Sequence, residues 1–343
     1  MRSFVRYLLL LAAVLVALSA YLPVRYRVPY PREPGPTFDN EVRVRHTFAM
    51  EESRAEFVLV GDSVLAHGID PQALSALLGM PAYAIAVPGS ASAIWYLILK
   101  NIILEAQEKP AYFIIVFRDT ILTLPDYHVN GGYVTEIDQY ATTHEDFLLE
   151  HSYLNFMNPI EKWALVYFPL YSTRQQITQT VEYYARNVIP SFFLTCRWDC
   201  LEKDLASVYH VDNVEEEFRV DALVTEENTL FTRQAMNFDA QVGRSFLPEI
   251  IRLARENGIR LILVHERTLL FPSAQAEPQA LQEYKQALAA YLKYNNVPLL
   301  DFSYDPRLPK VYFEDPLHMN ETGKTAFTHL LAGALKVVIE VGQ

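Results

Sequence analysis

The sequence predicts an α/β protein organised around one parallel β-sheet. Short apolar, β-branched runs alternate with helix-length segments on both sides of a less regular middle part, and this alternation is typical of right-handed βαβ units. The first run stops abruptly at Gly61-Asp62-Ser63. Because parallel strands end at one edge of their sheet, polar residues at strand ends are expected to gather where open α/β sheets bind ligands. A largely helical insertion and an N-terminal hydrophobic helix complete the predicted architecture.

Individual elements follow from hydrophobic periodicity and from residues that begin or end helices. YFIIVF at 112–117 is apolar throughout, as suits a central parallel strand. Asp70-Pro71 and Asn320 are helix starts, whereas Gly258 is a helix end. The predicted strands are 57–60, 82–87, 112–117, 259–264 and 297–302. The predicted helices are 70–78, 91–108, 241–257, 277–294 and a last one from Asn320 to about residue 340.

The middle of the chain, at about 124–240, breaks this rhythm and is predicted to be an insertion. It is rich in tyrosine, histidine and acidic residues, with helix-like stretches at 145–156 and 174–186. A long insertion at the ligand edge can shape a substrate cleft, and a plain structural subdomain explains the same pattern. The domain that carries the insertion is predicted to span 56–343.

The N-terminus is predicted to be a signal anchor or a signal peptide, at 1–27. Arg2 and Arg6 precede an apolar run at 7–22, and this charge bias favours a cytoplasmic N-terminus with an exported body. Ala17-Leu18-Ser19 is a candidate cleavage site. We therefore expect a body held on the inner membrane and facing the periplasm or cell exterior, or else secreted after cleavage. A proline-rich tether and lead-in follow at 28–55.

Charge and cysteine content narrow the possible partners. The net charge of −12 argues against binding to a nucleic-acid backbone. The two cysteines, Cys196 and Cys200, are predicted to form a small-loop disulfide in an exported protein. Their spacing differs from the C-x-x-C of redox sites, and no further zinc ligands are evident nearby. We expect neither a metal nor a cofactor.

Ser63 is the first candidate for chemistry, since a strand followed by a glycine turn commonly presents a nucleophilic hydroxyl. A serine that merely caps the next helical turn is the alternative. A nucleophilic serine needs an imidazole base and a carboxylate that orients it. His318 lies three residues after Asp315 in a turn before the last helix, and that spacing lets the carboxylate reach the imidazole Nδ1. The alternative is that His318 is a surface loop histidine that lies near Asp315 by coincidence.

Taken together, Gly61-Asp62-Ser63, Gly89 and Asp315-Pro316-Leu317-His318 resemble the motifs of the SGNH (GDSL-type) hydrolase superfamily. The resemblance covers about 57–124 and 241–340. It implies a flavodoxin-like three-layer sandwich with Ser63 as nucleophile, His318 as base and Asp315 as its orienting carboxylate. It also implies that the Ser63 and Gly89 N–H groups form the oxyanion hole, and that Asp62 is a turn residue.

One motif departs from the superfamily. A Gly-x-Asn-Asp element is expected after the third strand, where its asparagine is the third oxyanion donor. This chain has Phe117-Arg118-Asp119-Thr120 there. Arg118 is therefore a candidate replacement donor, and the absence of that donor is the alternative.

The layout as a whole is similar to the D-alanyl-lipoteichoic acid transfer proteins and the alginate acetylation proteins. That similarity implies an exported O-acyltransferase that modifies a cell-envelope polysaccharide through an acyl-Ser63 intermediate, with a membrane-bound O-acyltransferase as partner. The alternatives are a serine esterase or deacetylase of acylated glycans or lipids, and a non-catalytic glycan-binding or scaffold protein on the same fold.

His265 and Arg267 follow the fourth predicted strand and are expected at the same edge. Either residue is a candidate contact for a sugar or an anionic group, and a structural ion pair is the alternative. Aromatic residues of the insertion are candidates for stacking on sugar rings, although core packing is the usual role of such residues. They are Tyr127, Tyr133, Tyr140, Trp163 and Tyr167.

Overall fold

The structure, a computed structural model, describes residues 2–26, 41–129, 133–142, 145–154, 158–174, 177, 180–181, 224 and 228–341. The chain forms two compact units. The smaller comprises 1–35 and 153–227, and the larger comprises 36–152 and 228–343. The predicted disulfide between Cys196 and Cys200 and the proline-rich part of the tether lie outside the described residues. The predicted domain boundaries stay predictions.

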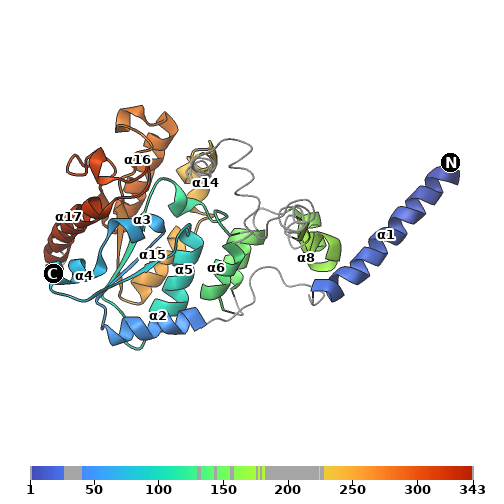
Figure 1. Ribbon diagram of the computed structural model, residues 1–343, viewed down its shortest axis with the longest axis horizontal. Helices are drawn as coiled ribbons and strands as arrows, with labels where there is room; N and C mark the ends of the chain where they lie inside the picture. The colour runs from blue at the N-terminus through green and yellow to red at the C-terminus, as the bar shows by residue number, and fades with distance from the viewer. Residues whose placement is uncertain are drawn as a thin grey trace, which may run out of the picture. The chain divides into compact units, whose positions relative to one another are not determined.

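The larger unit is built on a five-stranded parallel sheet with the order β2-β1-β3-β4-β5. This is the flavodoxin-like strand order, and helices lie on both faces of the sheet (Figure 1). The predicted fold class is therefore confirmed. The strands are β1 Phe57–Gly61, β2 Ala82–Ala86, β3 Tyr112–Phe117, β4 Arg260–His265 and β5 Leu299–Asp301.

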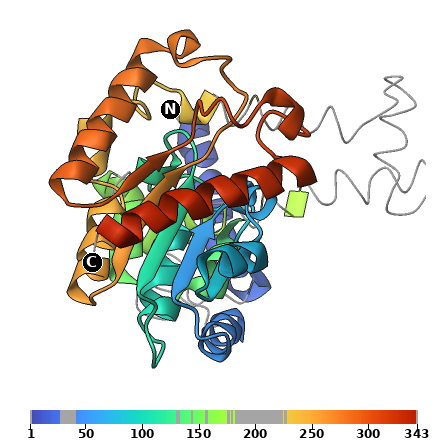
Figure 2. The same cartoon turned by 90° about the vertical axis from the view of Figure 1, so that its left-hand side faces the viewer.

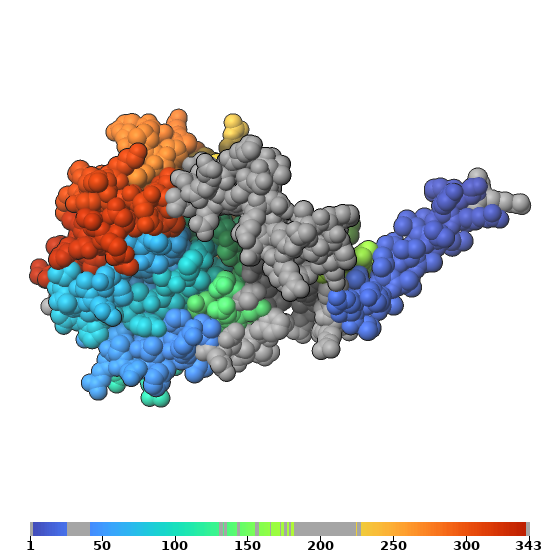
Figure 3. Space-filling view, viewed as in Figure 1, coloured from blue at the N-terminus to red at the C-terminus, as the bar shows by residue number. Residues whose placement is uncertain are grey.

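One face of the sheet is covered by α3 (Ser63–Gly68), α4 (Pro71–Leu78) and α17 (Glu321–Val341). Side chains alternate between the two faces of a strand, so Phe57 and Leu59 of β1 share this core with Phe327 of α17. Figure 2 shows α17 running across the sheet, and Figure 3 shows it at the surface beside α4. The helix that begins with Ser63 and the helix that follows His318 are thereby anchored in one core.

The opposite face is covered by α5 (Ser92–Ile98), which continues into the π-helical turn η1 (Leu99–Ile103), and by α15 (Leu247–Glu256). Every residue of α5 is buried. Further helices of the larger unit lie around these layers. They are α2 Glu41–Glu52, α6 Tyr133–Tyr140, α7 Asp146–Leu148, α14 Phe238–Val242 and α16 Gln279–Tyr294. Short turns complete the unit: η2 Ile121–Thr123, η5 Ala274–Ala276 and η6 Lys310–Tyr312. The π-helical turn η3 (Leu149–Leu154) begins in the larger unit and ends in the smaller one.

Two predicted helices differ from the observed ones. The helix predicted at 91–108 ends at Ile103, because the residues after it form turns in which the Gln107 N–H donates to Glu51 Oε1 (2.7 Å) instead. The helix predicted at 241–257 is split into α14 and α15. Pro248 lies in the first turn of α15, where its missing N–H costs nothing, and it could not have continued an earlier helix.

The smaller unit contains α1 (Arg2–Tyr26), α8 (Pro159–Tyr167) and α9 (Pro169–Ser172). Among the described residues, α1 is the one helix long and apolar enough to cross a membrane. Its candidate span is Ser3–Arg25, with a mean hydropathy of 2.3. This N-terminal apolar helix has the length and composition of a membrane anchor or a signal peptide.

Candidate active site

Ser63 is the first residue of α3 and follows β1 after a single linking residue. The N-cap is Asp62, whose Oδ1 accepts a hydrogen bond from the Val64 N–H (3.0 Å). Asp62, and not Ser63, therefore caps α3, and the Ser63 hydroxyl is available for another partner. Gly61 makes this tight turn possible, because a Cβ there would lie 2.8 Å from both Leu65 Cβ and the Val116 carbonyl oxygen.

The structure brings Ser63, His318 and Asp315 together. His318 Nε2 lies 2.8 Å from Ser63 Oγ, and His318 Nδ1 lies 2.8 Å from Asp315 Oδ2. Because an ionised carboxylate can only accept, Nδ1 carries the imidazole proton and Nε2 accepts the Ser63 hydroxyl. This chain of hydrogen bonds has the connectivity of a nucleophile, a base and an orienting carboxylate.

Asp315 is held in place by its own turn. Its Oδ1 accepts hydrogen bonds from the N–H groups of Leu317 (2.7 Å) and His318 (2.9 Å). Burial alone raises the pKa of the Asp315 carboxyl, but the hydrogen bonds from the His318 ring and these N–H groups outweigh it and hold the pKa below its usual value. Asp315 therefore stays ionised, as an orienting carboxylate must.

Gly89 lies in a turn that is tied to the end of β1. The Ser90 N–H donates to the Val87 carbonyl (2.9 Å), and Ser90 Oγ donates to the Gly61 carbonyl (3.2 Å). Gly89 has a φ of 72°, which a residue with a side chain adopts only under strain. Within the described residues, neither the Gly89 N–H nor the Ser63 N–H has a hydrogen-bond acceptor. Both donors are thus available to an oxyanion.

A stack of three rings covers Gly89, and no pattern in the sequence indicates its position. The His128 ring lies between Tyr127 and Tyr133, with ring centroids 3.8 and 3.9 Å away. His128 Nδ1 lies 2.6 Å from the Gly89 carbonyl oxygen, and a Cβ at Gly89 would lie 2.9 Å from Tyr133 Cε1. The first helix of the insertion therefore packs directly on the candidate oxyanion turn.

Arg118 is buried beside Asp62, the residue that precedes Ser63. Its Nε lies 3.3 Å from Asp62 Oδ2 and its Nη1 lies 3.4 Å from Asp119 Oδ2, with 2% of the side chain exposed. Two of its nitrogens thus hold carboxylates, one of them on the residue before the candidate nucleophile. Asp62 is consequently more than a turn residue, since it joins a helix cap to a buried ion pair.

Glu266 adds a third buried carboxyl group to this cluster, beside those of Asp62 and Asp119. It follows β4, and both carboxyl oxygens lack a hydrogen-bond partner among the described residues. Burial and the charge of Asp62 raise the pKa of Glu266 well above its usual value, although Arg118 opposes this. Its carboxyl group lies against Gly68, where a Cβ would come within 2.4 Å of Oε1. Glu266 therefore packs against the far end of α3.

A second histidine stands beside His318. His67 is four residues after Ser63 on α3, and its ring centroid lies 4.6 Å from that of His318. His67 Nδ1 lies 3.2 Å from Glu314 Oε1, and both side chains are about half exposed. The i, i+4 spacing from Ser63 was the available sequence signal for this residue.

Among the described residues, the carboxylate and imidazole atoms of Glu314, Asp315 and His318 lie within 4.8 Å of one another, close enough to be drawn around a metal ion. Two of these residues already hold each other through the Nδ1–Oδ2 hydrogen bond. A metal on Nδ1 would displace that proton, so the metal and the Ser63–His318–Asp315 arrangement exclude each other.

His265 and Arg267 are engaged inside the fold. His265 is 4% exposed, stacks on Phe117 with 4.9 Å between centroids, and has Nδ1 3.3 Å from Asp301 Oδ1. Arg267 Nη1 donates to the Asp305 carbonyl (2.6 Å). The ion-pair alternative accounts for His265, and Arg267 braces the loop after β5. Their role as substrate contacts stays a prediction.

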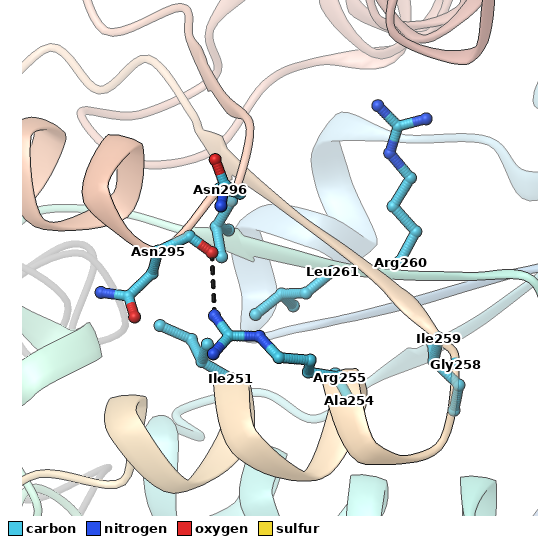
Figure 4. A pocket seen from close by; sticks show the side chains of 10 residues that line it. Ile251, Ala254, Arg255, Gly258, Ile259, Arg260, Leu261, Asn295 and Asn296 are labelled. Carbon is cyan, nitrogen blue, oxygen red and sulfur yellow. Dashed lines mark hydrogen bonds between the residues drawn. The ribbon is translucent and has the colours of Figure 1, made fainter. Parts of the chain in front are cut away.

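A pocket of about 290 Å³ lies at the opposite edge of the sheet, beside the start of β4 (Figure 4). Arg255 and Arg260 line it, and Arg255 Nη2 donates to the Asn295 carbonyl (3.0 Å). None of Ser63, His318 and Asp315 lines this pocket.

No family profile matches the sequence, and no curated protein matches it. Among solved structures, the chain is similar to a putative acylhydrolase from Bacteroides fragilis NCTC 9343, with 12% identity, 86% of this chain and 96% of that chain covered, and a TM-score of 0.40. It is similar to a GDSL-like lipase from Bacteroides thetaiotaomicron VPI-5482, with 13% identity, coverage of 87% and 100%, and a TM-score of 0.39. A third is a putative lipolytic protein of the G-D-S-L family from Desulfitobacterium hafniense DCB-2, with 11% identity, coverage of 80% and 97%, and a TM-score of 0.37.

Proposed function

We propose that this chain is a serine-dependent acyl-transfer enzyme of the esterase or acylhydrolase kind, acting through an acyl-Ser63 intermediate. The observation that carries the proposal is the continuous hydrogen-bond chain from Ser63 Oγ through His318 to Asp315, with 2.8 Å at each link. At this distance the imidazole can take the proton of the Ser63 hydroxyl, which supports a role of Ser63 as nucleophile and of His318 as its base.

In the first half-reaction, Ser63 Oγ attacks the carbonyl carbon of an ester while its proton passes to His318 Nε2. The resulting imidazolium is stabilised by Asp315 at Nδ1. The tetrahedral oxyanion accepts hydrogen bonds from the Ser63 and Gly89 N–H groups, which lack other acceptors among the described residues. Collapse of the intermediate breaks the ester bond, and the leaving alkoxide takes the proton from His318.

In the second half-reaction, the acceptor hydroxyl gives its proton to His318 Nε2 and attacks the acyl-Ser63 ester. Collapse releases Ser63, which regains its proton from the imidazole. With water as acceptor the product is a free acid, and with a sugar hydroxyl it is a new ester. The same residues serve both outcomes, because access of water and of the sugar decides between them.

Our finer proposal is that the acceptor is a hydroxyl group of a cell-envelope polysaccharide, that the body is exported, and that a membrane-bound O-acyltransferase supplies the acyl group. It is supported by α1, whose apolar span of 23 residues suits a protein held at a membrane. It is also supported by the similarity in layout to polysaccharide-acylating proteins.

Covalent labelling tests the coarse function. A fluorophosphonate probe added to the full chain in detergent should give one adduct on Ser63, and a chromogenic acetyl ester should be hydrolysed. Both signals should fall by at least about a thousandfold in Ser63→Ala. Absence of both labelling and turnover in the wild-type chain would refute serine catalysis.

Product analysis tests the finer function. The wild-type chain is given an acetyl donor together with a neutral oligosaccharide, and the products are separated by mass spectrometry. Acetylated oligosaccharide in excess of free acetate supports transfer, whereas free acetate alone supports an esterase. Protease accessibility of the body in intact spheroplasts tests export separately.

A non-catalytic glycan-binding protein is the second candidate, favoured by one observation. Arg118 stands where an oxyanion asparagine is expected, and its Nε and Nη1 hold Asp62 and Asp119. This candidate predicts that oligosaccharide binding persists in Ser63→Ala and that the probe leaves Ser63 unlabelled.

A further inference from the structure

Helix α8 of the smaller unit carries an exposed apolar stripe. Ile160, Trp163 and Tyr167 are 78%, 59% and 59% exposed. Their spacing of three and then four residues places them on one face of the helix. The Trp163 and Tyr167 rings lie 6.2 Å apart, centroid to centroid, so the aromatic part of the stripe is continuous.

The start of α8 is firmly built, which shows that the stripe is not a frayed end. Asn158 Oδ1 accepts from the N–H groups of Ile160 (3.0 Å) and Glu161 (2.9 Å). Glu161 Oε2 accepts from the Asn158 N–H in return (2.9 Å), which completes a capping box. The helix thus presents its apolar side chains on a defined face.

The same unit contains the candidate membrane span, and the two are linked through α9. This short helix packs against both α1 and α8. The first part of α1 is exposed along its length, whereas Leu22 near its end is 6% exposed. A bilayer core takes about 20 helical residues, so a span that begins at Ser3 leaves the hydrocarbon at about Leu22. The first buried residue of α1 therefore lies near the point where the span would leave the hydrocarbon.

We propose that α8 lies in the membrane–water interface at the C-terminal end of α1, with Ile160, Trp163 and Tyr167 among the lipid headgroups and upper acyl chains. Trp and Tyr suit this depth, because each has an apolar ring and a polar group that stays hydrated. Lys162, on the exposed surface of α8, suits contact with anionic headgroups. Part of the insertion is then a lipid-contacting element in addition to any role in catalysis.

A lipid surface is favoured over a protein partner by two features. The stripe is short, smaller than the surface that a stable protein interface buries, and the unit that carries it already holds a helix of membrane-spanning length. If the stripe serves a protein partner instead, Trp163 should stay in water in the reconstituted chain, and that result would overturn the proposal.

Tryptophan fluorescence measures the depth of α8 directly. The chain has three tryptophans, of which Trp95 is 0% exposed. The full chain with Trp198→Phe is reconstituted into phosphatidylcholine–phosphatidylglycerol vesicles, and quenching is compared between lipids spin-labelled near the headgroup, lipids labelled deep in the acyl chain, and aqueous iodide. We expect shallow-labelled lipids to quench at least about twofold more than either other quencher.

The matched control is Trp163→Phe in the same background, in which lipid quenching should disappear because Trp95 is buried. If Trp198→Phe does not fold, the difference between the wild-type chain and Trp163→Phe isolates the same signal. Quenching of Trp163 by iodide without quenching by lipid would overturn the proposal. The result does not depend on acyl transfer, so it stands or falls separately from the proposed function.

Discussion

The His128 Nδ1 atom lies 2.6 Å from the Gly89 carbonyl oxygen. His128 adopts a φ of 51°, in the left-handed region that residues with a side chain seldom occupy, although Asn, Asp and His do so more often than others. The surrounding fold therefore holds His128 in a less favourable backbone conformation, in which its ring contacts the candidate oxyanion turn. Since a carbonyl only accepts, Nδ1–H donates here and fixes the peptide that follows Gly89. His128 is therefore a positioning residue for the candidate oxyanion turn.

Replacing His128 by Phe should lower kcat about tenfold and leave KM nearly unchanged. Phe keeps the ring between Tyr127 and Tyr133 but removes the donor, so Gly89 is held less firmly. The expected loss is smaller than the 10²–10³ that removal of an oxyanion donor causes, because the Gly89 N–H itself remains. Steady-state hydrolysis of an activated ester measures both constants.

His128→Asn is the matched control, since Asn keeps a donor and tolerates positive φ but removes the ring. An Asn variant close to wild type, beside a weakened Phe variant, assigns the effect to the hydrogen bond. The reverse order would assign it to stacking and contradict positioning through Gly89. The amide shift of Gly89 in both variants gives a readout without substrate.

Asp62→Asn should lower the free energy of unfolding by about 3 kcal/mol. Asn still caps α3, but Arg118 loses one of its buried carboxylate partners, and breaking a buried ion pair typically costs 3–5 kcal/mol. Asp119 remains beside Arg118, so the lower end of that range is expected. Denaturant unfolding of the full chain in detergent provides the measurement.

The companion change is Arg118→Met, alone and combined with Asp62→Asn. If the two residues are coupled, the double variant should lose clearly less stability than the sum of the single losses. Additive losses would mean that Arg118 and Asp62 act independently, and the 3.3 Å contact would then carry no energy.

Glu266→Gln should stabilise the protein at alkaline pH and leave it unchanged at low pH. The pKa of Glu266 is raised in the folded state, chiefly by burial. Below the unfolded value of about 4.5 both states hold the proton, so the folded state pays no penalty. As the pH rises through and beyond that value, the unfolded chain ionises first, and stability is lost until the folded pKa is reached. Gln cannot ionise, so it removes this loss.

Unfolding temperatures of both proteins between pH 4 and pH 9 test the expectation. The gap between the two unfolding temperatures should open with rising pH, and it corresponds to about 1.4 kcal/mol of unfolding free energy for each unit between the folded and unfolded pKa values. The groups that face the carboxyl are Asp62, Arg118 and the backbone of Gly68, and all are common to both proteins. A gap that is constant across the range would show that the pKa of Glu266 is not raised in the folded chain.

The sequence predicted the residues whose relationship is local or carried by a motif. Asp315 and His318 share one turn. The strand-glycine pattern before Ser63 indicates the sheet edge at which this turn meets Ser63. Residues joined only by strand order were missed. Asp62 and Arg118 are 56 positions apart and meet because β1 and β3 are neighbours in the sheet.

His128 was missed for a different reason. It lies in the insertion, where no periodic pattern indicates which residues turn back toward the sheet. Its place over Gly89 depends on the path of the chain after β3, which short-range signals do not determine. Arg118 was correctly identified as a departure from the expected Gly-x-Asn-Asp element. Because the chain lacks that element, the motif could not indicate which residues Arg118 contacts.

Zinc should inhibit the enzyme, and a chelator should leave it active. The Glu314, Asp315 and His318 ligand atoms lie within 4.8 Å of one another, so modest movement would place each of them about 2.0–2.2 Å from a zinc ion between them. Zinc bound at His318 Nδ1 would displace the proton that Asp315 accepts, and His318 would lose the orientation needed to serve Ser63. Glu314→Gln should weaken the inhibition at least about tenfold while turnover without zinc stays near wild type, because Glu314 pairs with His67 and not with Ser63. Loss of activity with the chelator would instead show that a metal at these residues supports catalysis, and the proposed roles of Asp315 and His318 would have to be abandoned.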